Sequence, residues 1–380
     1  MKVDFLDLKA INSPYFETYL KIVEETLHTS SFIGGSYCDL FESNFAKYLN
    51  AKGCVGVGNG TDALEIAIKS LNLPKGSQII VPANTFKASC EAILNMGYKA
   101  VIVDCDNNYN INIGSLLQAI TPFTSAIMIV HLYGRICDVA RIVEIARDHN
   151  LFLIEDCSQA HGAKIKLDNE ILFAGTIGDI GTFSFYPSKN LGAIGDGGCI
   201  VSNNETLLSR ARSIANHGSQ THEKLSFVGR NSRLDNIQAA FLNLKLQDLD
   251  KQNAHRRYIA TLYQKYLSKL DSLVLPEIPF YDYQCVWHLY VIRLQKQLEE
   301  KRQDLIEFLM QNGIETRIHY PQNLGRMKEI KFHIHTIVRS TLNATNWDKT
   351  ILSLPMGEHI QEEHVAFIAK KIEEFCNKNT

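Results

Sequence analysis

The sequence lacks several features that would assign it to a membrane, nucleic-acid or metal-binding class. It has no apolar run long enough to span a bilayer, and its first residues, MKVDFLDLKAINSPYF, lack the apolar core of a signal peptide. A formal net charge of −2 leaves no basic excess for binding nucleic acid or a membrane surface. The nine cysteines form no CxxC pair or other metal spacing. We therefore expect reduced core thiols in a cytoplasmic protein, with no metal site.

Two common nucleotide-binding motifs are also missing. No GK[ST] triplet is present, which excludes a P-loop. The stretch GVGNGT resembles the dinucleotide fingerprint, but Thr61 stands where the third glycine should be. This argues against an oxidoreductase that binds a dinucleotide.

The 380 residues suit two domains, and the first part of the chain alternates between two kinds of segment. Between residues 52 and 202, short apolar runs such as QIIVP, AVIVDCD and LFLIEDCSQ alternate with amphipathic helical segments. This pattern predicts an α/β fold with a mostly parallel central sheet buried on both faces. We assign residues 1–245 to a large domain that includes the N-terminal helices.

After residue 202 the pattern changes, and we assign residues 246–380 to a smaller α+β domain. Residues 233–270 read as one long helical tract. WHLYVIRL and ETRIHYP (315–321) read as strands, and EEHVAFIAKKIEEFCNK reads as a terminal helix. The helices before residue 50 should pack on one of the two domains.

Three features fall where a parallel sheet binds its ligands, just past the carboxyl ends of strands. GNGTD opens a helix after a strand, so its free amides could bind a phosphate or could form a plain helix cap. Asp156 ends a buried strand, either as a satisfied structural carboxylate or as the partner of a protonated ring nitrogen. Lys189 lies one strand later, between an aromatic run and a glycine-rich run.

Together these features make the set that pyridoxal 5'-phosphate requires. That cofactor needs an anion cradle, an acid that keeps its pyridine nitrogen protonated, and a lysine that forms a Schiff base. The lysine must be uncharged to attack an aldehyde, which an apolar or cationic setting favours by lowering its pKa.

Eight motifs in order resemble those of the DegT/StrS sugar aminotransferase family, over about residues 30 to 320. They are GNGTDALEIAI, VPANTFKAS, VHLYG, IEDCSQAHGA, FSFYPSKNLGAIGDGG, NHGS, GRNSRLDNIQAA and WHLYVIR, with weaker support from LSLPM. The resemblance implies a fold-type I enzyme that uses pyridoxal phosphate. It would transfer an amino group, usually from glutamate, to a keto group of a nucleotide-linked deoxysugar.

The resemblance also implies roles for residues around the cofactor ring. Lys189 matches the Schiff-base lysine that also moves protons, and Asp156 matches the partner of the pyridine nitrogen. Gln159 would hydrogen-bond the phenolic oxygen, and Phe86 would stack on the ring. His131 and His161 are explained equally well as structural histidines.

Phosphate and substrate contacts follow from the same resemblance. Gly60, Thr61 and Ser184 would hold the phosphate, and Asn231 from a second subunit would complete the cradle, so the active site of a homodimer would be shared. The residues matching positions near the sugar and nucleotide are Arg233, His319 and Tyr320.

The loop GAIGDGG and the run NSRLD resemble members that aminate carbon 3 of the sugar; amination at carbon 4 is the alternative. We expect a thymidine diphosphate sugar first and a uridine diphosphate sugar second. The chain departs from the family at Arg135, Ser188, Arg230 and most of segment 322–340, which borders the sugar site. Two rivals, a pyridoxamine-dependent dehydratase and a non-catalytic regulator on the same fold, are disfavoured because Lys189 and Asp156 are both retained.

Overall fold

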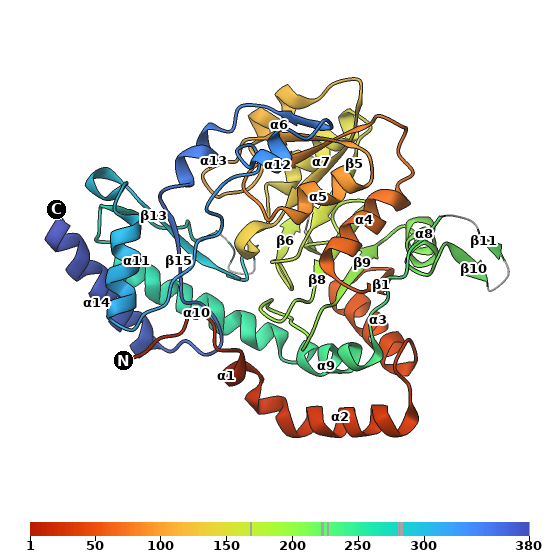
Figure 1. Cartoon of the computed structure of the whole chain (residues 1–380), viewed down its shortest axis with the longest axis horizontal. Helices are drawn as coiled ribbons and strands as arrows, with labels where there is room; N and C mark the ends of the chain where they lie inside the picture. The colour runs from red at the N-terminus through yellow and green to blue at the C-terminus, as the bar shows by residue number, and fades with distance from the viewer. Residues whose placement is uncertain (168, 222–223, 226–227, 280, 282–283, 380) are drawn as a thin grey trace.

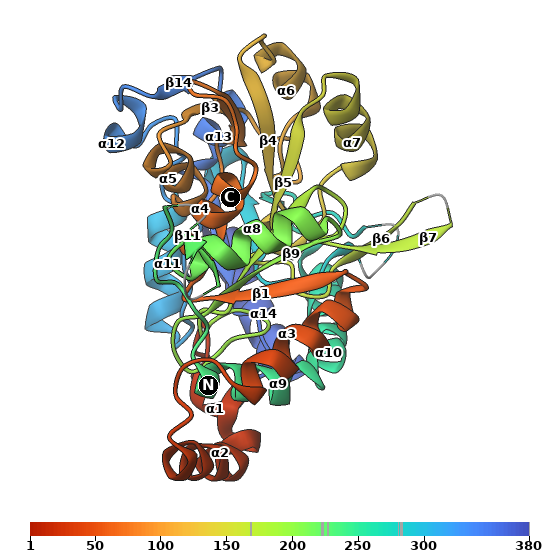
Figure 2. The same cartoon turned by 90° about the vertical axis from the view of Figure 1, so that its right-hand side faces the viewer.

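The computed structural model describes residues 1–167, 169–221, 224–225, 228–279, 281 and 284–379. Within that part of the chain, the central sheet has eight strands in the order β1-β9-β8-β5-β4-β2-β3-β14 (Figures 1 and 2). Strand β9 runs antiparallel to β1 and β8, and the other neighbouring pairs are parallel. The mostly parallel sheet predicted from the sequence is confirmed.

The sheet strands are short, and they are largely buried except for the edge strand β14, whose three residues are only partly buried. The strands are β1 (Gly53–Val57), β2 (Gln78–Pro82), β3 (Lys99–Val103), β4 (Thr124–Val130), β5 (Phe152–Asp156), β8 (Ile180–Ser184), β9 (Gly198–Ser202) and β14 (Thr336–Val338). In β2, Ile79 and Val81 join one apolar core while Ile80 joins the other. Because successive side chains of a strand point to opposite faces, these runs bury both faces of the sheet.

Helices cover the two faces of the sheet. Those of the large sheet region are α3 (Ser36–Leu49), α4 (Gly60–Ser70), α5 (Ala88–Asn95), α6 (Ile113–Ala119), α7 (Val139–Asp148), α8 (Glu205–Ala215) and α9 (Asn236–Leu246). Helices α4, α5 and α8 pack together on one side, while α3 packs against α9 on the other. A short 3-10 turn, η2 (Leu132–Gly134), follows β4.

The C-terminal part builds a third core around a small antiparallel sheet of β12 (Leu273–Val274), β13 (Tyr290–Leu294) and β15 (Ile351–Leu354). Three helices pack around this sheet: α10 (Leu249–Leu267), α11 (Arg302–Gln311) and α14 (Glu362–Asn379). Val3 belongs to the same core, so the N-terminal residues lie beside the C-terminal part (Figure 1).

The remaining elements are peripheral. They are α1 (Leu8–Asn12), η1 (Ser13–Tyr15), α2 (Phe16–Thr29), β6 (Lys164–Leu167), β7 (Glu170–Phe173), β10 (Ser219–Thr221), β11 (Lys224–Leu225), η4 (Lys296–Leu298), α12 (Lys328–Lys331) and α13 (Leu342–Trp347). The β6–β7 hairpin projects from the body of the protein in Figure 2. Helix α2 packs on α9, whereas Tyr15 of η1 donates to Asp248 just before α10, so the helices before residue 50 contact both parts of the chain.

Two secondary-structure predictions were wrong in detail. The single tract over 233–270 is two helices, because the chain leaves helical pairing between Leu246 and Leu249. Residues 315–321 form no strand: Arg317 and Ser353 exchange two backbone hydrogen bonds in one isolated bridge. Pro321 has no amide hydrogen with which to continue such a ladder.

The division at residues 245 and 246 stays a prediction. It falls in the last turn of α9, and β14 from the C-terminal part pairs with β3 of the large sheet.

All nine cysteines are free and buried, as expected for core thiols. Among the described residues, no helix combines the length and apolar character that crossing a membrane would need.

Candidate functional site

The predicted site residues come together at one edge of the central sheet. Gly60 follows β1, Phe86 follows β2, Asp156 ends β5 and Ser184 ends β8. These strands are parallel, so their carboxyl ends meet at the same edge. His319 and Tyr320 reach this edge from the C-terminal part, where Tyr320 contacts both Phe86 and Gln159.

Asp156 is a buried carboxylate with polar partners. One carboxylate oxygen accepts a hydrogen bond of 2.8 Å from the Ser89 hydroxyl of α5, and the other accepts one of 3.1 Å from the Ser158 amide. Burying a charge is costly without such partners. The geometry holds the carboxylate in one orientation at the end of β5.

Lys189 lies in the turn after β8, and its own amide donates to Tyr186 at 2.9 Å. Burial lowers the pKa of the Lys189 amine to about 8, against the opposing effect of the Asp156 carboxylate. A much larger fraction of the Lys189 amine is therefore uncharged near neutral pH than in an exposed lysine.

The charge of Lys189 acts on three histidines, His161, His288 and His319, and each has a lowered pKa. Burial is the main cause, and the Lys189 cation is the largest charge effect on each of them. The pKa falls to about 3 for His161 and to about 4 for His319, and that of His288 lies well below its usual value. All three rings are therefore neutral at physiological pH.

A chain of contacts joins the predicted ring-binding residues. Gln159 donates to the Tyr320 hydroxyl at 3.0 Å and accepts from the Tyr133 amide at 2.7 Å. The Phe86 and Tyr320 rings lie 5.9 Å apart. Phe86 is 51% exposed, which leaves an apolar ring open toward a flat ligand.

The first turn of α4 lies against the end of β8. The Asn59 side chain caps the helix by accepting from the Asp62 amide at 2.8 Å. Within the described residues, the amides of Gly60 and Thr61 have no acceptor, as expected for a helix start. A Cβ atom at Gly60 would lie 2.6 Å from the Ser184 Cβ, so this close approach requires glycine.

Asn231 and Arg233 flank Ser232, which is hydrogen-bonded to residues at the start of α4. The buried Ser232 hydroxyl donates to Asp62 at 2.6 Å and accepts from the Gly58 amide at 3.0 Å. Asn231 and Arg233 themselves are exposed, and Arg233 donates to Asn216 at 3.4 Å. The structure therefore places both residues near the start of α4 with side chains on the surface.

The residues that depart from the family have mixed structural explanations. Arg230 pairs with Asp62 at 3.1 Å and with Glu65, which fastens the 230–233 segment to α4. Arg135 donates to the Glu277 carbonyl at 2.6 Å. Segment 322–340 contributes the edge strand β14, and nothing in the structure explains Ser188.

The group of His131, Glu155 and Cys157 has the residue types of a metal site, but the lone pairs of Glu155 and His131 already accept hydrogen bonds within the protein. Glu155 accepts from the amides of Gly175, Ile177 and Gly178 and pairs with His131 Nε2 at 2.9 Å. His131 Nδ1 in turn accepts from the Cys137 amide at 3.2 Å. His131 is therefore a structural histidine behind the site.

Sequence reasoning missed several residues that support the site. Ser89 lies inside the motif VPANTFKAS, but the sequence pattern does not predict the hydrogen bond from its hydroxyl to Asp156. Tyr133 holds Gln159 through its amide, and its hydroxyl donates to the His319 carbonyl. His288, in the motif WHLYVIR, has no signal that separates it from an ordinary strand residue.

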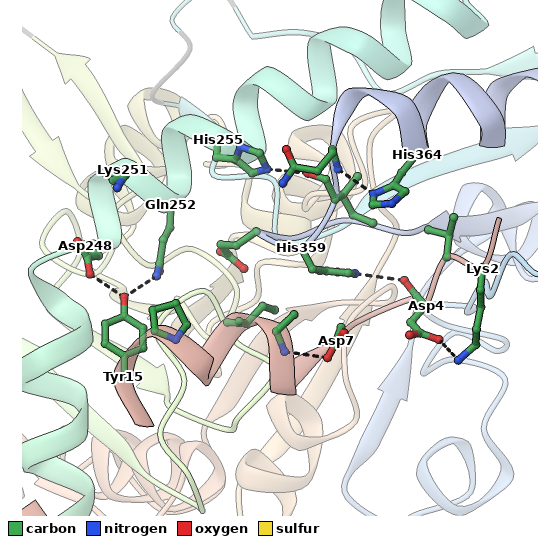
Figure 3. Close-up of a pocket in the computed structure, with 17 residues that line it drawn as sticks. Lys2, Asp4, Asp7, Tyr15, Asp248, Lys251, Gln252, His255, His359 and His364 are labelled. Carbon is green, nitrogen blue, oxygen red and sulfur yellow. Dashed lines mark hydrogen bonds and ion pairs between the residues drawn. The ribbon is translucent and has the colours of Figure 1, made fainter. Parts of the chain in front are cut away.

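A large cavity lies away from this edge. It measures about 770 Å³ and lies between α1, α10 and the segment before α14, as Figure 3 shows. Its wall includes Asp248, His255 and His359, but neither Lys189 nor Asp156. The cavity is therefore separate from the cluster at the sheet edge.

The residues at the sheet edge fit pyridoxal phosphate. The free amides of Gly60 and Thr61 suit a phosphate, the open Phe86 ring suits a flat heterocycle, and the buried Asp156 suits a protonated ring nitrogen. Lys189, with its lowered pKa, is the amine that can bind covalently.

The comparisons with known proteins agree with this geometry. The DegT/DnrJ/EryC1/StrS aminotransferase family matches residues 16–373. A dTDP-3-amino-3,6-dideoxy-alpha-D-galactopyranose transaminase from Aneurinibacillus thermoaerophilus is 42% identical, over 84% of this chain and 85% of that protein. A pleiotropic regulatory protein from Geobacillus stearothermophilus is 36% identical, over 99% of both chains.

A solved structure shares the whole fold. The structure of S. venezuelae DesV in complex with a ketimine intermediate superposes with a TM-score of 0.90 and 32% sequence identity, covering 99% of this chain and 98% of that one. The expectations of a fold-type I aminotransferase that uses pyridoxal phosphate are confirmed. The chain belongs to the DegT/DnrJ/EryC1/StrS aminotransferase family.

Proposed function

We propose that this protein transfers an amino group from glutamate to the keto carbon of a nucleotide-linked deoxysugar, with carbon 3 as the position aminated. The observation that carries the proposal is the meeting of Lys189, Asp156 and the free amides of α4 at one sheet edge. The transaminase from A. thermoaerophilus supports carbon 3 and a thymidine diphosphate sugar by its name.

Each side chain has a proposed task. Bound pyridoxal phosphate supplies the carbonyl carbon that exchanges amino groups and a ring that accepts electrons. Lys189 binds the cofactor and moves protons beside it, and Asp156 keeps the ring nitrogen protonated. Gln159 bonds the phenolic oxygen, while Phe86 covers the ring and excludes water.

The anionic part of the ligands would be bound at the start of α4. We assign the phosphate to Gly60, Thr61 and Ser184, because their backbone and hydroxyl donors lie together where a helix dipole favours negative charge. Arg233, His319 and Tyr320 are assigned to the nucleotide sugar. His319 is neutral, so it would act as a hydrogen-bonding group and not as a cation.

We also propose that the enzyme is a homodimer with shared sites. Asn231 is exposed beside α4, where it can reach a second subunit. A groove beside α2 is lined by Leu27, Phe32 and Ile33, and Phe32 and Ile33 are 49% and 57% exposed. Such a patch is typical of a protein–protein interface.

The experiment that tests the reaction is spectroscopic. The purified protein should be yellow, and glutamate should bleach that colour as the cofactor takes up the amino group. Borohydride reduction followed by peptide mapping should then place the cofactor on Lys189. Absence of any spectral change with glutamate, in a protein that holds the cofactor, would contradict the aminotransferase proposal.

The position of amination requires its own assay. Turnover should be compared on matched nucleotide-linked 3-keto and 4-keto sugars, with thymidine and uridine diphosphate carriers. Preference for a 4-keto substrate would overturn the proposed regiochemistry but leave the amino-transfer chemistry intact.

A regulatory function is the second candidate, because the G. stearothermophilus relative is named a pleiotropic regulatory protein. The retention of Lys189 and Asp156 favours the enzyme. Bleaching by glutamate without turnover of any nucleotide ketosugar would favour the regulator.

A further inference from the structure

Lys245 of α9 is a buried lysine to which the proposed reaction gives no task. The residue is only 2% exposed. Its ammonium donates to the Gly192 carbonyl at 2.9 Å and to the side-chain oxygen of Asn12 at 3.2 Å. Burying a charged group is costly, and an apolar side chain would avoid that cost. The two hydrogen bonds are therefore what the lysine contributes at this position.

The Gly192 carbonyl belongs to the segment that carries Lys189. Residues 185–197 join β8 to β9, and the structure, which describes all of them, places no helix or strand among them. The Ala193 amide donates to the Phe185 carbonyl at 2.8 Å and closes the turn around Lys189. Because the turn belongs to no regular element, its position depends on contacts with other parts of the protein.

Gly192 is packed against the residues that precede Lys189 in this turn. A Cβ atom at Gly192 would lie 2.4 Å from the Pro187 carbonyl oxygen, so the two stretches of backbone touch each other. The Lys189 amide donates to the Tyr186 carbonyl at 2.9 Å, next to that contact. A displacement of Gly192 would therefore be passed on to the backbone of Lys189.

Buried side chains hold the turn at two points. At the first, the side-chain amide of Asn190 donates to Asn253 of α10 at 2.9 Å and to the Val286 carbonyl at 3.0 Å. At the second, Lys245 is the one hydrogen-bond donor to the Gly192 carbonyl among the described residues. Losing this donor would leave a buried carbonyl without a partner and would release the second point.

The Lys245 ammonium also contacts the N-terminal segment. Helix α1 lies beside α9 in both views (Figures 1 and 2). The side-chain nitrogen of Asn12 donates to the Leu8 carbonyl at 2.8 Å, which leaves the side-chain oxygen to accept from Lys245. Asn12 is therefore a second acceptor that a substitution can remove while the hydrogen bond to Gly192 stays.

We propose that Lys245 is a positioning residue for amino transfer, which fixes the turn carrying Lys189 by donating a hydrogen bond to the Gly192 carbonyl. Lys245 acts through this turn and takes no part in the exchange of protons or amino groups. Without the bond, the turn would loosen and expose the Lys189 amine to water. The proposal rests on Lys189 being the reactive amine of the proposed function.

The first test needs neither cofactor nor turnover. Only Gly162 and Gly192 are followed by alanine, so carbon-13 in glycine carbonyls and nitrogen-15 in alanine should give two correlated signals. In the cofactor-free full chain, Lys245→Met should shift the carbonyl resonance of Gly192 and leave that of Gly162 in place. Asn12→Ala should leave both in place. A Gly192 resonance that ignores Lys245→Met would overturn the proposal.

Competitive acetylation of the cofactor-free protein measures the consequence for the reactive amine. Burial lowers the pKa of Lys189 to about 8, so exposure to water should raise it toward the value of an ordinary lysine. We expect this rise in Lys245→Met and not in Asn12→Ala. In the loaded enzyme, Lys245→Met should lower kcat about tenfold with an unchanged KM for the sugar.

Conservative variants separate positioning from a general structural role. Lys245→Arg keeps the charge and a donor, and Lys245→Gln keeps a donor alone. Turnover should follow the Gly192 resonance: a variant with a resonance close to that of the wild type should have a kcat close to that of the wild type. A variant that restores the resonance but stays as slow as Lys245→Met would overturn the proposal.

Thermal unfolding should confirm that each variant is folded at the assay temperature. An equal loss of kcat in Lys245→Met and Asn12→Ala would assign the effect to the N-terminal segment and contradict the role given to the Gly192 bond. Because the resonances and the pKa of Lys189 are measured without cofactor, failure of this proposal is distinct from failure of the aminotransferase proposal.

Discussion

At the scale of single residues, Lys189 is balanced between two opposing influences. Burial lowers the pKa of its amine and the Asp156 carboxylate raises it, with a result of about 8. The amine is therefore about half uncharged at pH 8, and its neutral fraction grows as pH rises through that value. A stronger attraction to a carboxylate, or greater exposure to water, would raise the pKa of the amine and leave it charged and unreactive.

Replacing Asp156 by asparagine should leave more of the Lys189 amine uncharged but should slow turnover. Removing the carboxylate should lower the pKa of Lys189 below about 8, which competitive labelling of the cofactor-free protein would measure. Turnover should nevertheless fall by about 100-fold or more, because the proposed partner of the ring nitrogen is lost.

Ser89→Ala is the matched control for that change. It removes the 2.8 Å hydrogen bond to Asp156 but keeps the charge, so turnover should fall by only about tenfold. Wild-type turnover in Asp156→Asn would contradict the role given to this carboxylate.

At the scale of elements, the α4 cap links stability to ligand binding. Asn59→Ala removes the side chain that accepts from the Asp62 amide and should cost about 1 kcal/mol of unfolding free energy. Asn204→Ala removes the equivalent cap from α8, which lies away from the site, and should cost a similar amount. Equilibrium dialysis should show weaker cofactor binding in Asn59→Ala alone; equal binding in both variants would argue against a phosphate at α4.

The sequence predicted the sheet and the centre of the site better than their surroundings. Apolar strands alternating with helices indicated the parallel sheet, and Asp156 and Lys189 followed from chemistry that few residue types can perform. Contacts between distant segments were beyond sequence reasoning. Neither the Ser89 hydrogen bond to Asp156 nor the hydrogen bond between Tyr133 and Gln159 has a periodic signal, because each depends on how separate elements pack.

The same dependence on packing explains why some predicted helices and strands differ from the structure. The hairpin of β6 and β7 was not predicted, since its strands are short and only partly buried. The strand expected at 315–321 has the right composition, but it meets its neighbour at one residue pair. Strand formation there depends on the length of the partner, which the local sequence does not encode.

At the scale of the whole molecule, the shared site can be tested by mixing two inactive variants. Lys189→Ala lacks the reactive amine, and Asn231→Ala lacks the residue assigned to the neighbouring site. In a hybrid dimer, one site combines wild-type Lys189 with wild-type Asn231. Random mixing should therefore restore about a quarter of the sites.

The unmixed variants serve as controls for that experiment, and sedimentation should confirm a dimer in each case. Wild-type activity of Asn231→Ala alone would remove Asn231 from the site. Hybrids that stay inactive although both parents are folded and dimeric would place the two residues in the same subunit's site.

Stability should fall as pH rises above about 9. Burial raises the pKa of eight of the nine cysteine thiols, so the folded state keeps protons that the unfolded chain releases. Lys189 and Lys245, whose pKa values are lowered to about 8, act in the opposite sense but are outnumbered.

Urea unfolding under reducing conditions at pH 7.5 and pH 10 would measure this loss. Cys285→Ala should show a smaller loss, because it removes a thiol whose pKa is raised to about 12. A free energy of unfolding that rises between those pH values would contradict the expectation.

The pairing of β14 with β3 has a consequence for the chain during its synthesis. Residues 99–103 leave the ribosome more than 200 residues before their neighbour at 336–338. Until then, the outer border of β3 offers unpaired amides and carbonyls to any other extended peptide. The nascent protein should therefore depend on chaperone protection until its last fifth has been translated.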